Sequence, residues 1–183
     1  MTRVFLDYDQ QALDDAYDQS VYAPNRAQLL ARFASTSEAV RRRLGAPQRL
    51  SYGKTPVEGM DFYPAKKANA PVNLFVHGGA WRAGAAKDYA FPAEVLVRAG
   101  AHYAALDFDN VLEAEGSLFP MADQVRRAIA WTFVNISKYG GDPARLYVSA
   151  TSSGAHLAGV AATPDWKKDF GLPADIVKGY VLV

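Results

Sequence analysis

Ser152 is the side chain of this sequence best placed to act as a nucleophile. It lies between a mostly apolar run, residues 145–150, and a run of small and apolar residues, 155–162. The first run has no helical periodicity and is typical of a buried parallel strand, whereas the second indicates a helix. A serine at a sharp turn from strand to helix has its hydroxyl exposed above the edge of a sheet, where it can attack a carbonyl carbon. The chemistry that this arrangement favours is acyl transfer.

Glycine spacing assigns the nucleophile to Ser152 rather than to its neighbour Ser153. Gly154 lies two residues after Ser152, as the pattern G-x-S-x-G requires, whereas Ser153 would require a glycine in place of Ala155. The first glycine of the pattern is replaced by Ala150, which adds one methyl group at a crowded position. A serine two residues before a glycine also occurs in ordinary tight turns, so this motif alone does not establish catalysis.

A second motif, HGGAW at residues 77–81, follows a predicted central strand. Acyl transfer builds negative charge on the carbonyl oxygen, and each preorganised N–H donor there is worth about 3–4 kcal/mol. Glycines after a strand allow the backbone to direct such N–H groups into a site. We therefore predict that the N–H groups of Gly79, Ala80 and Ser153 form an oxyanion hole, with Gly78 shaping the turn. The alternative is that the two glycines only form a turn.

These motifs require a sheet whose strands end beside each other, with helices that cover it. Six short runs read as strands: residues 48–52, 59–63, 72–76, 102–108, 145–150 and 176–183. Three runs of the same region read as helices: residues 92–98, 120–136 and 155–162. The alternation from residue 72 onward predicts an α/β fold with a mostly parallel central sheet and helices on both faces.

The first 47 residues carry helical patterns. Residues 9–17 form one predicted helix, and capping patterns that begin at Asn25 and Ser35 predict two more. Three apolar side chains of the second helix are expected to face inward: Leu29, Leu30 and Phe33. We therefore expect a cap-like helical segment at residues 1–47 and a single core domain at residues 48–183.

Composition narrows the classes of function. The chain has 183 residues, of which 50% are hydrophobic and 21% charged, and its formal net charge is +1. This balance gives no electrostatic reason to expect a nucleic acid or a membrane surface as a partner. The absence of cysteine excludes disulfides, thiolate metal sites and a cysteine nucleophile. The acidic first residues and the lack of a long apolar run lead us to expect a cytoplasmic enzyme.

The motifs resemble one branch of the α/β-hydrolases. HGGAW at 77–81, Gly-Gly-Asp-Pro at 140–143, Ser-Ser-Gly-Ala-His-Leu at 152–157 and the segment 13–20 are similar to the arylformamidase (kynurenine formamidase-like) branch, close to the hormone-sensitive-lipase-like esterases. Ala150, and Thr151 where histidine is common, depart from the pattern.

The resemblance implies a serine hydrolase that forms an acyl-enzyme and needs neither a metal nor an organic cofactor. Its substrate would be a small molecule, either a short-chain carboxylic ester or an N-formyl or aryl amide. The N-terminal segment of that branch packs over the mouth of the active site. We therefore expect Tyr17, Tyr22 and Trp81 to form an aromatic, substrate-binding mouth over Ser152, although ordinary packing would also explain these rings.

The sequence does not contain an evident general base for Ser152. In this fold the triad runs Ser, then Asp or Glu, then His, yet the 31 residues after Ser152 contain one histidine only, His156, which lies one helical turn past the serine. We expect His77 in the oxyanion loop, His102 at the opposite end of the sheet and His156 packed against the sheet.

We therefore expect the chain to be the N-terminal two-thirds of a hydrolase, lacking the C-terminal third, with the acid and base in a complementary C-terminal segment. A homodimer is a further possibility. Two alternatives stay open: a non-catalytic small-ligand binding protein of the same fold, and an inactive fragment or structural module.

Overall fold

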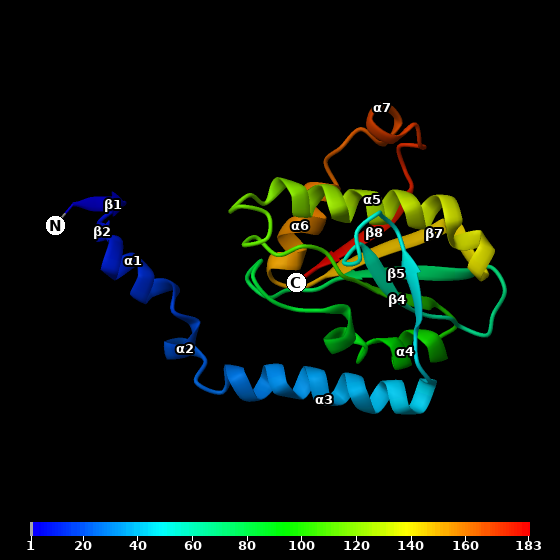
Figure 1. Ribbon diagram of the computed structural model, residues 1–183, viewed down its shortest axis with the longest axis horizontal. Coiled ribbons are helices and arrows are strands. Elements are labelled where there is room, and N and C mark those ends of the chain that lie inside the picture. The colour runs from blue at the N-terminus through cyan, green and yellow to red at the C-terminus, as the bar shows by residue number, and fades with distance from the viewer. Residues whose placement is uncertain (1) are drawn as a thin grey trace.

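A six-stranded sheet runs through the middle of the protein in the computed structural model, which describes residues 2–183 (Figure 1). The strand order is β3-β4-β6-β5-β7-β8. The strands are β3 (Gln48–Ser51), β4 (Gly59–Tyr63), β5 (Ala70–Val76), β6 (His102–Leu106), β7 (Gly141–Ala150) and β8 (Val177–Leu182). β6, β5, β7 and β8 pair in parallel, whereas the pairings of β3 with β4 and of β4 with β6 are antiparallel. The predicted mostly parallel sheet is therefore confirmed.

The register between β5 and β7 brings the two sequence motifs to one edge of the sheet. Val76, the last residue of β5, is paired with Ala150, the last residue of β7. HGGAW follows the first of these residues and Ser152 follows the second. Because the carboxyl ends of parallel strands lie at the same edge, residues far apart in sequence meet there.

Helices cover both faces of the sheet, as predicted. α5 (Phe119–Asn135) and α6 (Ser153–Ala161) lie on one face, and α3 (Arg26–Leu44), α4 (Ala93–Arg98) and the 3-10 turn Ala86–Tyr89 lie on the other (Figure 1). In α5 the periodic side chains Met121, Val125 and Ile129 are fully buried. They pack with alternate residues of the central strands, while the intervening residues of those strands face α3 and α4.

The N-terminal part differs from the sequence-based expectation. A small hairpin, β1 (Arg3–Phe5) and β2 (Tyr8–Asp9), precedes α1 (Gln10–Tyr17) and α2 (Gln19–Tyr22), and this segment lies to one side of the sheet (Figure 1). The predicted break at Ser35 is wrong, because α3 continues from Arg26 to Leu44. The hydroxyl of Ser35 bonds to the carbonyl of Arg32 in the preceding turn, so it does not compete with the helix as a cap.

The two halves of α3 have different surroundings. Ser37 and Val40, in the second half, are buried against the 3-10 turn and α4. Leu29, Leu30 and Phe33, in the first half, are 44%, 43% and 36% exposed, so the expectation that they face inward is wrong. The periodicity correctly placed them on one face of the helix, but two of them, Leu30 and Phe33, border an open cavity rather than the core.

Two further findings concern the part of the chain that the structure describes. A short helix, α7 (Trp166–Phe170), which the sequence reading did not include, is capped by the carboxylate of Asp165. No helix among residues 2–183 has the length and apolar character needed to cross a bilayer, and no group of three metal-binding side chains is found there.

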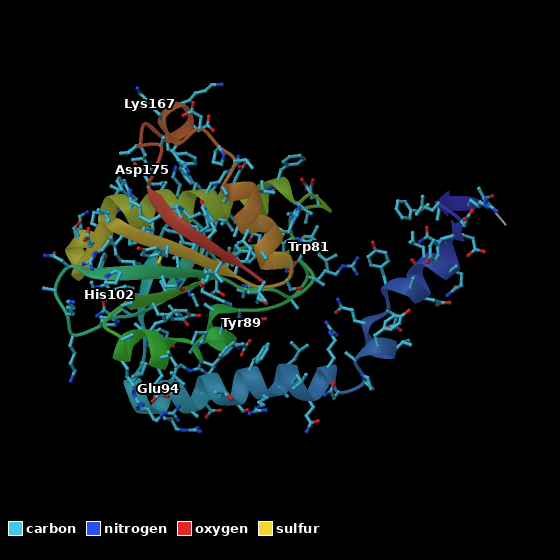
Figure 2. The ribbon with its side chains drawn as sticks, turned by 180° about the vertical axis from the view of Figure 1, so that it is seen from behind. Trp81, Tyr89, Glu94, His102, Lys167 and Asp175 are labelled. Carbon is cyan, nitrogen blue, oxygen red and sulfur yellow. The ribbon has the colours of Figure 1, made fainter. Side chains whose placement is uncertain are left out.

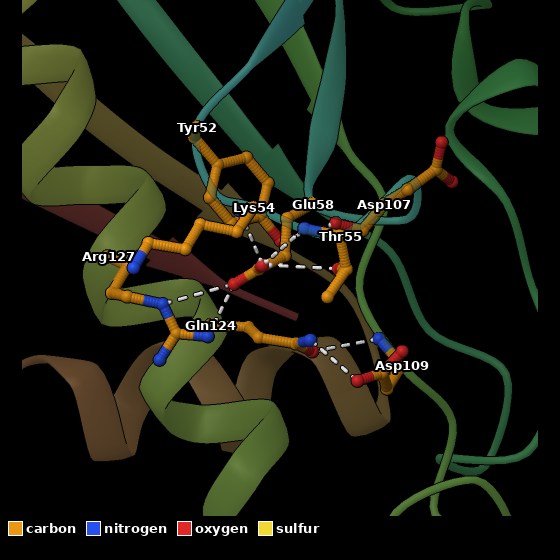
Figure 3. A network of polar contacts seen from close by, with 8 residues as sticks. All are labelled: Tyr52, Lys54, Thr55, Glu58, Asp107, Asp109, Gln124 and Arg127. Atoms are coloured by element: carbon orange, nitrogen blue, oxygen red, sulfur yellow. Dashed lines mark hydrogen bonds and ion pairs between the residues drawn. The ribbon is translucent and has the colours of Figure 1, made fainter.

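An ion pair joins the turn between β3 and β4 to α5 (Figure 3). The carboxylate of Glu58 is buried and accepts hydrogen bonds from Arg127, from the N–H groups of Lys54 and Thr55 and from the Thr55 hydroxyl. Burial by itself would raise the pKa of this carboxyl, but the bonds from Arg127 and the turn outweigh it and lower the pKa from 4.5 to about 2. A β-carbon on Gly53 would lie 2.3 Å from the Glu58 carboxyl carbon, so the turn closes tightly over this side chain.

The lowered pKa predicts how stability changes with pH. A carboxyl whose pKa is lower in the folded state stabilises the protein above its unfolded-state pKa, and that contribution is lost as the pH falls toward about 2. We expect Glu58→Gln to lower Tm by roughly 5 °C at pH 7 and by much less at pH 3. Thermal unfolding followed by circular dichroism at both pH values measures this difference. Glu115→Gln, at an exposed position, is the control and should leave Tm unchanged at both; an equal loss for Glu58→Gln at both pH values would contradict the prediction.

Candidate active site

Ser152 occupies the turn between β7 and α6 in a strained backbone conformation. Its φ is 53° and its ψ is −127°, a region that residues other than glycine rarely adopt, and its side chain is exposed. The turn holds the hydroxyl above the sheet edge as the sequence predicts for a nucleophile. Strain of this kind costs about 1–3 kcal/mol and persists only where the surrounding structure enforces it.

The two glycines next to this turn are required by close backbone contacts. A β-carbon on Gly154 would lie 2.3 Å from the carbonyl oxygen of His77 and 2.4 Å from that of Val76. A β-carbon on Gly78 would lie 2.9 Å from Cβ of Ser152. Ala150, which stands in place of the first glycine, is buried in the main core.

The loop after β5 turns through three consecutive residues with positive φ. These angles are 133° at Gly79, 53° at Ala80 and 60° at Trp81, and the N–H groups of Arg82 and Ala83 both bond to the Gly79 carbonyl. A β-carbon on Gly79 would lie 1.9 Å from the carbonyl oxygen of Ala83, so only glycine fits at this position.

Three backbone N–H groups at Ser152 and the HGGAW loop have no hydrogen-bond acceptor among the described residues. Those of Gly79, Ala80 and Ser153 donate no hydrogen bond to any acceptor among residues 2–183. They are the three donors that the sequence predicts for an oxyanion hole. Unpaired N–H groups next to an exposed serine are what stabilisation of a tetrahedral oxyanion requires.

His77 supports the loop from behind. Its ring is stacked between Phe108 and Tyr89, with centroids 4.4 and 5.4 Å away. Its Nδ1 lies 2.8 Å from the carbonyl oxygen of Gly78, and because that oxygen only accepts, Nδ1 carries the proton. Burial lowers the pKa of His77, which keeps the ring neutral at neutral pH. His77 therefore fixes the start of the loop.

The other two histidines are also not bonded to the nucleophile. His102 lies at the start of β6, at the opposite end of the sheet as expected, and its Nδ1 accepts a bond from the N–H of Ala65. His156 was expected to pack against the sheet, and this is wrong. Its neighbours Leu157 and Ala158 take the inward positions of α6, so His156 is exposed, with its ring edge-on to Trp81 at 5.6 Å. Among residues 2–183, no histidine ring forms a hydrogen bond with the hydroxyl of Ser152.

A cavity of about 380 Å³ opens over Ser152 and the HGGAW loop that follows β5. Its walls come from the loop itself, from the turn at Ser152, from Asp88 and Tyr89 of the 3-10 turn, from Gln19 of α2 and from the first half of α3. The side chains that face it from α3 include Arg26, Leu30 and Phe33. The sequence reading did not assign these residues to the site, because helical periodicity gives the side on which they lie but not what lies opposite.

The structure does not bring the three predicted aromatic residues together. Tyr17 and Tyr22 are 78% and 73% exposed and do not line the cavity over Ser152. They belong to α1 and α2, which lie away from the sheet in both views (Figures 1 and 2). Trp81 lies beside α6 (Figure 2) and lines a second cavity, behind the HGGAW loop, together with His77 and Ser153. The aromatic wall near Ser152 is formed by Phe33 and Tyr89 instead.

The sheet order, the strained serine and the loop of free N–H groups together define an α/β-hydrolase. Residues 60–177, more than half of the chain, match the model of the BD-FAE family, and the protein belongs to that family.

Curated relatives agree with this assignment. A kynurenine formamidase of Salmo salar is 30% identical over 151 residues, which cover 80% of this chain and 49% of the relative. The isoprenylcysteine alpha-carbonyl methylesterase ICME of Arabidopsis thaliana is 33% identical over 112 residues, covering 60% of this chain and 26% of the relative. These matches confirm the predicted resemblance to the arylformamidase and hormone-sensitive-lipase-like branch. The chain spans about half the length of the kynurenine formamidase and about a quarter of that of the methylesterase.

Solved structures show the same fold. An esterase from Thermogutta terrifontis with bound propionate superimposes with a TM-score of 0.64 at 18% sequence identity, over 76% of this chain and 54% of the other.

The contact at Gly154 generates a prediction with a control in the same helix. Gly154→Ala should lower the free energy of unfolding by about 2–3 kcal/mol, because its β-carbon would collide with backbone that cannot move without separating β5 from α6. At Gly159 the nearest atom to an added β-carbon is Cδ1 of Leu182 at 3.8 Å, so Gly159→Ala should be neutral or stabilising by about 0.5–1 kcal/mol. Urea unfolding of the two variants tests this. Similar stabilities would show that the close approach at Gly154 is not required.

Proposed function

We propose that the protein is a serine hydrolase in which Ser152 forms an acyl-enzyme with a small carboxylic ester or amide. The observation that carries this proposal is the exposed, strained serine next to three unpaired backbone N–H groups, those of Gly79, Ala80 and Ser153. An ordinary tight turn would require neither the strain nor a second loop of unpaired donors.

The proposed reaction follows from that arrangement. The hydroxyl oxygen of Ser152 attacks the substrate carbonyl carbon while its proton passes to a base, and the carbonyl oxygen becomes an oxyanion. The N–H groups of Gly79, Ala80 and Ser153 donate to this oxyanion, as preorganised donors do in acyl transfer. The carbon–oxygen or carbon–nitrogen bond of the substrate then breaks, and the alcohol or amine leaves with a proton. Water attacks the acyl-enzyme through a second oxyanion and releases the acid.

The general base is proposed to come from outside residues 2–183. Serine acyl transfer requires a base within hydrogen-bond reach of the hydroxyl, and no histidine ring described here makes that bond. Either a complementary C-terminal segment or a second subunit of a homodimer could supply the acid and the base.

The cavity supports a substrate with a small apolar group. Leu30, Phe33 and Tyr89 provide apolar walls close to Ser152, while Arg26 and Asp88 place one charge of each sign on the cavity lining. Short-chain esters and N-formyl or aryl amides fit this size and character. The names of the relatives, a kynurenine formamidase and a methylesterase, support the same two substrate classes.

A second candidate function is non-catalytic binding of a small acyl or aromatic ligand in the same cavity. The lack of a base bonded to Ser152 among the described residues favours it. Covalent chemistry at Ser152 separates the two candidates.

In a preparation that also contains the acid and the base, we expect a fluorophosphonate to label the protein once, on Ser152, because the reagent needs both an activated serine and the oxyanion donors. Ser152→Ala should abolish the labelling and the hydrolysis of p-nitrophenyl acetate without lowering Tm. Mass spectrometry of the labelled peptide locates the adduct. Ligand binding in the cavity without labelling would support the binding protein, and labelling that persists in Ser152→Ala would refute the assignment of the nucleophile.

The aromatic wall formed by Phe33 and Tyr89 predicts a preference for substrates with an aryl group. Phe33→Ala should lower the preference for aryl over methyl or ethyl groups by about tenfold, because the substrate ring loses an aromatic contact. The measurement is the ratio of kcat/KM for phenyl acetate to that for ethyl acetate, and for methyl benzoate to that for methyl acetate. Phe119→Ala, at a side chain that is 83% exposed, is the control. If neither ratio changes in Phe33→Ala, Phe33 does not contact the substrate.

A further inference from the structure

The side chain of Ser153 faces away from the cavity over Ser152. It is only 7% exposed and lines the second cavity, behind the HGGAW loop. Its hydroxyl oxygen accepts a hydrogen bond from the backbone N–H of Trp81, with an N–O distance of 3.2 Å. The residue that follows the nucleophile is therefore connected through its side chain to the end of the HGGAW loop.

This bond acts on a strained part of the loop. Ala80 and Trp81 both have positive φ, which costs non-glycine residues roughly 1 kcal/mol or more each. The peptide groups on either side of the Trp81 α-carbon are held by neighbours: its N–H bonds to Ser153, and its carbonyl accepts a bond of 2.7 Å from the N–H of Val111. Without the bonds to Ser153 and Val111, only the two bonds to the Gly79 carbonyl would oppose relaxation of Trp81 toward negative φ, a change that would also turn the N–H of Ala80.

Ser153 also contributes to the oxyanion hole directly. Its own N–H is one of the three unpaired donors, and the other two belong to Gly79 and Ala80 on the loop. The hydroxyl of Ser153 thus contacts the loop, and the N–H of the same residue is a donor at the serine turn. The hydroxyl holds the loop in place, and the N–H lies at the elbow, which is the turn between β7 and α6 that carries Ser152.

We propose that the Ser153 hydroxyl is a positioning group that fixes the spacing between the elbow donor and the loop donors of the oxyanion hole. This inference rests on the proposed serine-hydrolase function. The hydroxyl does not touch the substrate, so its loss should weaken stabilisation of the oxyanion while leaving ground-state binding of the substrate unchanged. Removing one oxyanion donor lowers kcat by about 10²–10³-fold. A donor that is only displaced should therefore lower kcat by less than this.

The experiment compares Ser153→Ala with Ser153→Thr, which keeps the hydroxyl, and with Ser149→Ala as the matched control. Ser149 also loses one side-chain hydrogen bond on truncation, the 2.7 Å bond from its hydroxyl to the side-chain oxygen of Asn73. For p-nitrophenyl acetate we expect Ser153→Ala to lower kcat by about 10- to 100-fold with KM within about twofold of the wild type. Ser153→Thr should recover kcat to within a few-fold, and Ser149→Ala should keep it.

Amide hydrogen exchange of Trp81, read by NMR, tests the bond itself without relying on turnover. The Trp81 N–H should exchange at least about tenfold faster in Ser153→Ala than in the wild type and in Ser153→Thr, while the Val111 N–H stays protected in all three. Unchanged exchange at Trp81 would overturn the inference, and so would faster exchange with an unchanged kcat. The kinetic comparison uses a preparation that also contains the acid and the base; a wild-type protein in that preparation that shows the protected amide but no Ser152-dependent turnover would instead overturn the proposed function.

Discussion

The first turn of α6 lies against the last residues of β5, and only a residue without a side chain fits between them. The carbonyl oxygens of Val76 and His77 lie where a β-carbon on Gly154 would be. This close approach sets the angle at which the chain leaves β7, and hence the strained φ and ψ of Ser152. It also brings the start of HGGAW next to the elbow, since both follow paired ends of β5 and β7. The geometry of the candidate site depends on this one contact between backbones.

The free-energy cost of the strained backbone at the carboxyl edge of the sheet is offset by burial of side chains in the core. Ser152, Ala80 and Trp81 are non-glycine residues with positive φ, and together they cost several kcal/mol. The core that compensates is the sheet with α5 and α6, where side chains such as Leu74, Leu146 and Ile129 are fully buried. Local hydrogen bonds then select one loop conformation from those that the core would permit. The neutral His77 and the hydroxyl of Ser153 hold opposite ends of the loop.

The helix α3 has two roles that its sequence does not separate. Its second half completes the core through Val40, and its first half forms a wall of the cavity over Ser152 through Leu30 and Phe33. An exposed apolar face on a helix is unusual for a surface that meets only water. Here that face borders a cavity in which an apolar group could be buried, which is consistent with the proposed substrates.

The sequence by itself predicted the six strands and the helices α4, α5 and α6, though not α7, and it is the basis for proposing Ser152 as the nucleophile and the loop N–H groups as donors. These features are local, because periodicity, glycine spacing and turn chemistry act over a few residues. Only the tertiary structure decided the surroundings of His156, which turns outward to Trp81, and of Phe33, which reaches the cavity. It also placed Tyr17 and Tyr22 outside the cavity, and it kept α3 continuous through Ser35. The physical reason is that a pattern defines one face of an element, whereas the partner of that face is set by packing between segments far apart in the chain.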